Sequence, residues 1–175
     1  MVLDFGAAEP VGGGDHAIRI RGEPFVGPAG EVLSRALGEA GVKRTEVYVT
    51  NAVKHFKFEP RGKRRIHQKP NASEIKPCRW WLEQERALIH PRIIVALGAT
   101  AGRSVLDRPI RLPAERGKPI SSNGGTILLT VHPSYLLRMP DEGRKREEYA
   151  AFVCDLRRAA ELANNHVRTT AGQEP

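Results

Sequence analysis

Long apolar runs are missing from this sequence, and cysteine is scarce. No stretch approaches the roughly 20 consecutive apolar residues of a membrane-spanning helix, and the start lacks the cationic and then apolar pattern of a signal peptide. The two cysteines, Cys78 and Cys154, are too few for a disulfide framework, and a lone intracellular cysteine is most often a buried apolar side chain. We therefore expect a cytoplasmic protein without membrane contact.

Acidic residues are also in deficit. The chain has 20 Asp and Glu against 28 Lys and Arg, which gives a formal net charge of +8 and a pI near 9.9. Such a charge favours a polyanionic partner, most simply nucleic acid, although charge alone is a weak indicator. At 175 residues the chain is long enough for one hydrophobic core. We predict one domain over residues 1–163 and a flexible polar tail over residues 164–175.

Alternating strand and helix patterns set the expected fold class. Short β-branched or aliphatic runs flanked by turn residues predict strands at 2–5, 46–50, 92–97 and 126–131. Apolar residues at helical spacing predict helices at 28–40, 73–89, 99–106 and 144–163. This order predicts an α/β fold, a three-layer α/β/α sandwich around a central, mainly parallel four-stranded sheet.

In such sheets, working residues collect on loops beyond the carboxyl ends of the strands. Gly6, Asn51, Gly98 and His132 occupy these positions, so we expect them at one edge. Two predicted loops are long, a glycine-rich one over residues 6–27 and a cationic one over residues 54–71; long loops are usually functional or disordered.

The cationic loop contains the run Lys63-Arg64-Arg65-Ile66-His67. Lys and Arg neutralise DNA phosphates without sequence preference, and a histidine near neutral pH can act as acid, base or nucleophile. The run therefore suggests a clamp on the DNA backbone that carries a reactive group. Taken alone, it is more typical of a solvated basic loop.

Asn51 and Phe25 are candidates for binding a flipped base. A side-chain amide offers a donor and an acceptor, so Asn51 could read the edge of a pyrimidine, although an isolated Asn at such a position more often caps a turn after a strand. Phe25 lies in a loop that opens a helix, where it could stack on a base or fill the core.

The segment from His132 to Arg138 follows an apolar strand. Its imidazole could donate a hydrogen bond to a departing base and stabilise the negative charge that develops there. We expect Ser134, Leu136 and Arg138 to contact DNA, with Leu136 as a wedge in the duplex and Arg138 at a phosphate. The alternative for His132 is a cap before a helix.

Together these residues resemble the uracil-DNA glycosylase superfamily, and more narrowly its UdgX-type branch, which is related to the iron-sulfur (class 4) enzymes. The resemblance runs from about Gly22 to Leu162. The segments that carry it are Pro24 to Gly30, Val47 to Phe58, Gly62 to His67 and Thr130 to Arg138.

The resemblance implies a reader of damaged bases. Uracil is flipped out, stacked on Phe25 and read by Asn51, and its leaving charge is stabilised by His132. His67 then attacks the sugar in place of water, so that the protein stays covalently joined to the abasic site, while Lys63, Arg64 and Arg65 hold the DNA backbone. The expected partner is uracil-containing DNA, single-stranded first, with double-stranded DNA left open; we expect a monomer associated with the nucleoid.

The chain departs from the family pattern in two places. The first motif is altered: Glu9 and Asp15 are the candidate catalytic carboxylates, but solvated acids of a glycine-rich loop fit that stretch equally well. Relatives hold a four-iron cluster through an N-terminal Cys-x-x-Cys pair and ligands near His55 and Cys78. Without that pair the set is incomplete, so we expect no metal and no cofactor, with the cluster lost or its N-terminal ligands truncated.

Two competing functions remain at this stage. The altered first motif and missing cluster ligands also fit a DNA-binding module of the same fold that has lost catalysis. A nucleotide-binding site at 98–102 is disfavoured, because that segment lacks the spaced glycines of a dinucleotide site.

Overall fold

A computed structural model describes residues 2–5, 25, 27–52, 54, 58–61, 64–67, 72–122 and 125–171. Five strands form a central sheet in the order β2-β1-β5-β7-β6. Their bounds are β1 (Val2–Phe5), β2 (Tyr48–Asn51), β5 (Ile93–Leu97), β6 (Pro119–Ser122) and β7 (Gly125–Thr130). Neighbouring pairs among β2, β1, β5 and β7 run parallel, and β6 pairs antiparallel with β7. The α/β class is confirmed, but the sheet is mixed and has five strands where the sequence predicts four.

Strand β5 shows why the sheet is covered on both faces. All five of its residues are buried, as expected for a central parallel strand. Its side chains alternate between two cores: Ile93, Val95 and Leu97 belong to one buried cluster, and Ile94 and Ala96 to the other.

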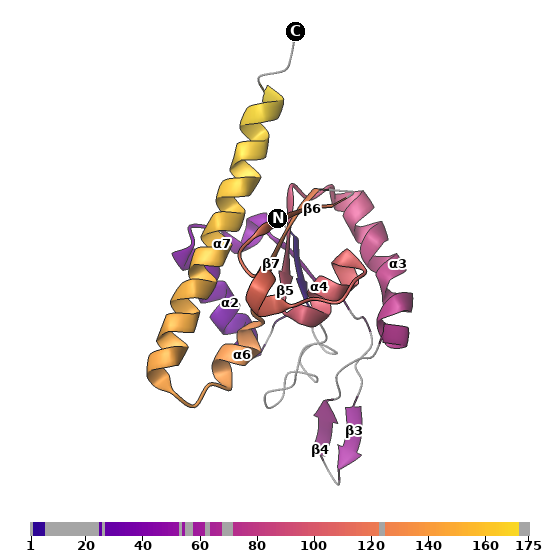
Figure 1. Ribbon diagram of the computed structural model, residues 1–175, viewed down its shortest axis with the longest axis vertical. Coiled ribbons are helices and arrows are strands. Elements are labelled where there is room, and N and C mark those ends of the chain that lie inside the picture. Colours follow the sequence, from indigo (N-terminus) through magenta and orange to yellow (C-terminus); the bar gives the residue numbers. More distant parts are fainter. Residues whose placement is uncertain are drawn as a thin grey trace.

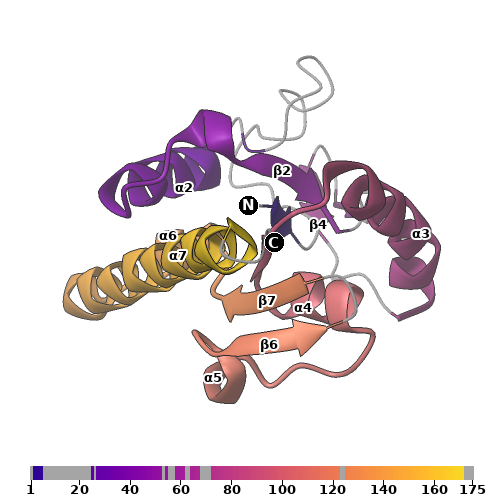
Figure 2. The same ribbon diagram turned by 90° about the horizontal axis from the view of Figure 1, so that it is seen from above.

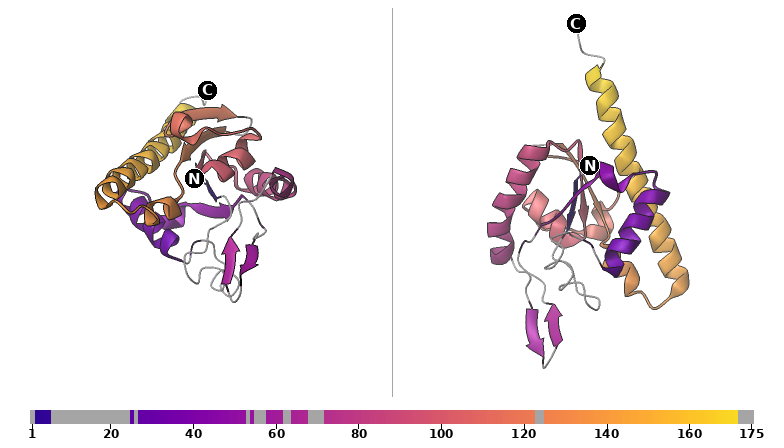
Figure 3. Two further views of the ribbon diagram at one scale, coloured as in Figure 1. Left: turned by 60° about the horizontal axis from the view of Figure 1, so that its bottom comes forward. Right: turned by 180° about the vertical axis from the view of Figure 1, so that it is seen from behind.

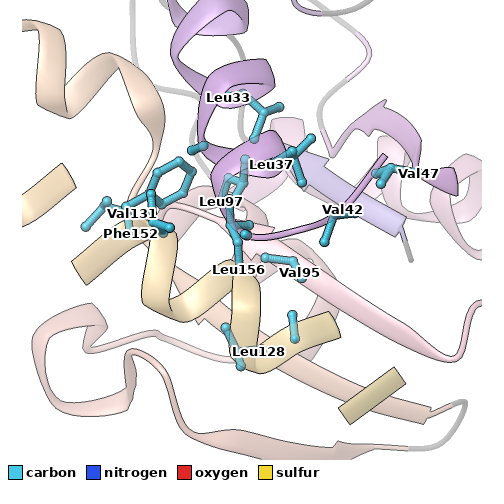
Figure 4. Packing of buried hydrophobic residues seen from close by; sticks show 14 of the residues in the cluster. Leu33, Leu37, Val42, Val47, Val95, Leu97, Leu128, Val131, Phe152 and Leu156 are labelled. Atoms are coloured by element: carbon cyan, nitrogen blue, oxygen red, sulfur yellow. The ribbon is translucent and has the colours of Figure 1, made fainter. Parts of the chain in front are cut away.

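Helices α2 (Pro28–Glu39), α6 (Pro133–Leu137) and α7 (Glu142–Ala171) lie on one side of the sheet, and α3 (Ala72–Ile89) and α4 (Ala99–Leu106) on the other (Figures 1 and 2). Leu33 and Leu37 of α2 meet Phe152 and Leu156 of α7 over the sheet (Figure 4). These four side chains are fully buried, and each contributes about 1.5–3 kcal/mol of transfer free energy.

A hairpin replaces the long loop predicted at residues 54–71. Strands β3 (Phe58–Arg61) and β4 (Arg64–His67) form a separate antiparallel pair. The hairpin projects from the domain, and α3 begins shortly after its second strand (Figures 1 and 3). It therefore presents β4 away from the main core.

The remaining elements are short: η1 (Arg44–Glu46) and α5 (Leu112–Glu115). Helix α7 continues past the end predicted at residue 163, as far as Ala171, while the flexible tail over residues 164–175 stays a prediction. Among the described residues, no helix is both long enough and apolar enough to cross a membrane.

Candidate active site

His132 lies just beyond the carboxyl end of β7, where it caps helix α6. The backbone N–H of Ser134 donates to His132 Nδ1 at 3.1 Å, and the Ser134 hydroxyl lies 2.7 Å from the same nitrogen. An amide N–H can only donate, so Nδ1 is the unprotonated nitrogen and the neutral ring carries its proton on Nε2. Nε2 is a buried atom. His132 is therefore arranged to donate a hydrogen bond from Nε2.

This arrangement adds to the role predicted for Ser134. Ser134 is 2% exposed and its hydroxyl faces the imidazole, so it positions His132, and its contact with DNA stays a prediction. Leu136 is also 2% exposed and belongs to the core cluster, which contradicts its prediction as a wedge. The burial of Ser134 and Leu136 follows from helix α6, which directs these residues and Pro133 inward and leaves Tyr135 40% exposed.

Phe25 lies beside His132. Their ring centroids are 5.6 Å apart and the rings are tilted by 49°. Phe25 has a left-handed φ of 69°, which is uncommon for a bulky residue. It is held against the start of α2, where a Cβ on Gly30 would come within 1.7 Å of the Phe25 carbonyl oxygen. Phe25 is half-buried and packs against the core cluster, so the structure places it at the site and the core boundary together.

Asn51 ends β2, at the same edge of the sheet. Its Oδ1 is buried and has no hydrogen-bond partner among the described residues. A buried acceptor without a partner is costly, so this atom is suited to a ligand that offers a donor. Two strands further along the sheet, Gly98 follows β5 with a φ of 88°, and a Cβ there would lie 3.3 Å from His132 Cβ. The predicted gathering of Asn51, Gly98 and His132 at one edge is therefore observed.

The structure describes some of the other predicted site residues. His67, Arg64 and Arg65 lie on β4, with His67 paired in register with Phe58. The hairpin extends from the same end of the domain as α6 (Figures 1 and 3). Arg138 is exposed at the C-terminal cap of α6, as its predicted phosphate contact requires. The predictions for Gly6, Glu9, Asp15, His55 and Lys63 fall outside the described residues.

The described residues do not form the donor set of an iron-sulfur cluster. Cys78 is fully buried on α3 and accepts a hydrogen bond from the Lys54 amide at 3.3 Å. Cys154 is exposed on α7, contrary to the expectation of a buried thiol. Within the described ranges, no three His, Cys, Asp or Glu side chains are grouped to hold a metal. The expectation of no cluster remains a prediction.

The sequence does not reveal a polar cluster that lies next to Asn51. Glu85 of α3 accepts hydrogen bonds from Thr50 Oγ1 and Lys54 Nζ, each at 2.8 Å. The only sequence signal for it is the polar alternation Tyr48, Thr50 in a strand that is otherwise buried.

A groove of about 790 Å³ lies elsewhere, between α3 and α4. Its lining includes Arg79, His90, Pro91 and Val105. His90 and Pro91 precede β5, so the groove lies at the amino end of the sheet. It is not part of the candidate site.

Comparison with known proteins identifies the family. The family model described as the Uracil DNA glycosylase superfamily matches residues 10–157. The Type-4 uracil-DNA glycosylase of Thermotoga maritima is 40% identical over 119 residues, which cover 67% of this chain and 58% of the relative. The Type-4 uracil-DNA glycosylase of Pyrobaculum aerophilum is 33% identical over 140 residues, 75% of this chain and 68% of the relative.

A Type-5 uracil-DNA glycosylase of Pyrobaculum aerophilum is 36% identical over 122 residues, 69% of this chain and 49% of the relative. The chain thus spans between about half and two-thirds of the length of these relatives. Because the family match covers most of the sequence, this chain belongs to the uracil-DNA glycosylase superfamily.

Proposed function

We propose that this protein is a uracil-DNA glycosylase of UdgX type, which excises uracil from DNA and then joins His67 covalently to the abasic sugar. One observation carries the first half of the proposal: the imidazole of His132 has a fixed hydrogen-bonded tautomer and lies 5.6 Å from the Phe25 ring. An aromatic face beside a donor at a strand edge suits a flipped pyrimidine.

Base release uses His132 and Asn51. The C1′–N1 bond breaks with its electron pair moving to uracil, which leaves as an anion. The Nε2–H of His132 donates to the uracil oxygen on which that charge collects, and this lowers the barrier because the donor is already oriented. Asn51 Oδ1, which is buried, accepts from the N3–H of the base and so favours uracil over bases without that donor.

Covalent capture uses His67. Loss of the base leaves an electron-poor C1′, and a lone pair of the neutral imidazole forms the new N–C1′ bond. The ring then carries a positive charge, and it releases its remaining N–H proton to uracil or solvent. A nucleophile held at about 3 Å reacts in preference to free water. Strand β4 supports this role, because its last residue, His67, pairs with Phe58 at the base of the hairpin, the end nearest the domain.

The DNA partner is supported by the distribution of charge. Residues 54–76 contain eight Lys and Arg and two Glu, a formal net charge of +6 within a chain of +8. We propose single-stranded DNA as the first substrate, since a flipped base costs least where it is unpaired. We also propose that the chain holds no iron-sulfur cluster, which an iron determination and a visible absorption spectrum of the purified protein would test.

The decisive experiment incubates the protein with a uracil-containing single strand and separates the products on a denaturing gel. We expect a heat-stable band of protein joined to DNA, and none with the matching cytosine strand, whose base has no N3–H to donate to Asn51. Absence of that band would overturn the proposed capture. Salt-sensitive binding to both strands without base release would instead favour the DNA-binding module that has lost catalysis.

The His67→Ser variant identifies the nucleophile. Removal of the imidazole leaves space for water, so we expect the adduct to disappear and free abasic DNA to appear, cleavable by mild alkali. A variant that forms the adduct as well as the parent would show that another residue attacks the sugar.

A further inference from the structure

Four polar side chains converge where β2 leaves the sheet. Glu85 accepts from the Thr50 hydroxyl at 2.8 Å and from Lys54 Nζ at 2.8 Å to each carboxylate oxygen. Lys54 Nζ also donates to Thr50 Oγ1 at 2.6 Å. Burial raises the pKa of Tyr48 above its ordinary value, and the nearby Glu85 carboxylate raises it further. The cluster therefore links α3 to the end of β2.

Lys54 is held through its backbone as well as its side chain. Its amide donates to Sγ of Cys78, which is fully buried. Cys78 lies about two turns before Glu85 on α3. Lys54 lies four residues before β3, and α3 itself begins five residues after His67. Along the chain, both ends of the β3–β4 hairpin therefore lead to α3 within a few residues, the first through the Lys54 contacts and the second through the start of the helix itself.

The cluster is stronger than a surface ion pair. The Lys54 and Glu85 side chains are 25% and 27% exposed, so solvent screens them less than an open pair. Several charge-assisted hydrogen bonds with a shared acceptor also restrict geometry more than one contact does. On the same helix, the pair of Arg79 with Glu83 has a carboxylate that is 48% exposed and no contact with β2.

We propose that Glu85 is a positioning residue for covalent capture: through Lys54 it fixes the root of the β3–β4 hairpin and thereby the approach of His67 to the sugar. This inference rests on the proposed function. Base release depends on His132 and Phe25, which are held by α6 and α2, and on Asn51. Asn51 is paired with Phe5 of β1 in the sheet, so Glu85 acts mainly on the later step.

The test is Glu85→Gln. Glutamine still accepts from Thr50, which preserves the strand end at Asn51, but it loses the charge that holds Lys54. We expect uracil release from a single-stranded substrate to stay within about twofold of the parent, while the rate of adduct formation falls roughly tenfold and free abasic DNA appears. Rapid-quench sampling on a denaturing gel measures both steps from one reaction.

A second variant and a matched control separate positioning from simple stability. Lys54→Gln should give the same shift from adduct to free abasic product, and the double variant should be no worse than either single one, because both remove one interaction. Glu83→Gln breaks the Arg79 pair on the same helix and should leave the ratio of adduct to free product unchanged.

Each outcome decides the inference. A parent protein that releases no uracil overturns the proposed function and this inference with it. A parent that releases and captures, with an unchanged product ratio in Glu85→Gln, overturns the inference alone. Equal loss of both steps together with a lower melting temperature would also overturn it, since that pattern is expected of a purely structural contact.

Discussion

At the scale of single residues, the placement of Phe25 depends on Gly30, which has no Cβ. Gly30 lies in the first turn of α2, where a Cβ would overlap the Phe25 carbonyl at 1.7 Å. No backbone carbonyl can be approached so closely, and Phe25 already has a left-handed φ of 69°. Glycine at position 30 therefore allows Phe25 to lie at its observed distance from His132.

Gly30→Ala should displace Phe25 and reduce uracil release by about 100-fold, the effect expected from a shift of roughly 1 Å at a reacting group. Gly38→Ala is the matched control on α2, because a Cβ there meets nothing within 4 Å. The control should gain about 0.5–1 kcal/mol of stability and retain activity. Single-turnover assays and thermal melts of both variants measure this, and equal activities would contradict the role of Gly30.

Residues that follow a buried strand are predictable from sequence, since apolar runs and turn residues mark where each strand ends. That is why Asn51 and His132 lie at the expected edge. The contacts of the next residues are harder to predict: Ser134 and Leu136 turn inward because they lie on α6. A helix of five residues is too short to show periodicity, so the sequence alone suggested that both contact DNA.

At the scale of elements, the β3–β4 hairpin shows a second limit of the sequence. Proline and clustered cations over residues 58–67 are unfavourable for a strand in a large sheet, so that stretch was predicted as a loop. A two-residue connection at Gly62-Lys63 was the available signal, because glycine in the first position suits a tight hairpin turn. Pairing then places His67 in register with Phe58.

Helix α7 is joined to β7 by an ion cluster that has a stability role. Asp155 accepts from Thr130 Oγ1 at 2.5 Å and from Arg116 Nε at 2.7 Å, and Arg116 also pairs with Glu148. The Arg116 and Asp155 side chains are 17% and 13% exposed. Loss of Asp155 leaves the largely buried Arg116 with Glu148 as its remaining partner and leaves the Thr130 hydroxyl without its acceptor.

Asp155→Ala should therefore lower the free energy of unfolding by about 3 kcal/mol, in the range seen when a buried pair is broken. Glu46→Gln is the control, because its pair with Lys43 is 3.9 Å long and both side chains are more than 60% exposed; its effect should stay below about 0.5 kcal/mol. Urea denaturation measures both. A loss for Asp155→Ala as small as that of the control would assign the cluster no stabilising role.

At the scale of the whole molecule, the cationic hairpin and the candidate active site lie at the same end of the domain. Residues 54–76, which include the hairpin, carry +6 of the formal net charge of +8, and the hairpin projects from the end of the domain where α6 positions His132 (Figures 1 and 3). The fold class and this charge segregation were predictable from sequence, since both depend on patterns along the chain. The convergence of Glu85, Lys54 and Thr50 was not, because it depends on how α3 packs against β2.

This uneven distribution of positive charge predicts how salt affects DNA binding. Each phosphate neutralised on a single strand contributes about 0.7 to the slope of log binding constant against log salt concentration. The double variant Arg64→Gln/Arg65→Gln should therefore reduce the slope by about 1.4. Arg92→Gln removes an exposed cation just before β5, at the amino end of the sheet, and should leave the slope unchanged. Fluorescence anisotropy over a salt series measures all three proteins, and equal slopes would mean that the hairpin does not bind the DNA backbone.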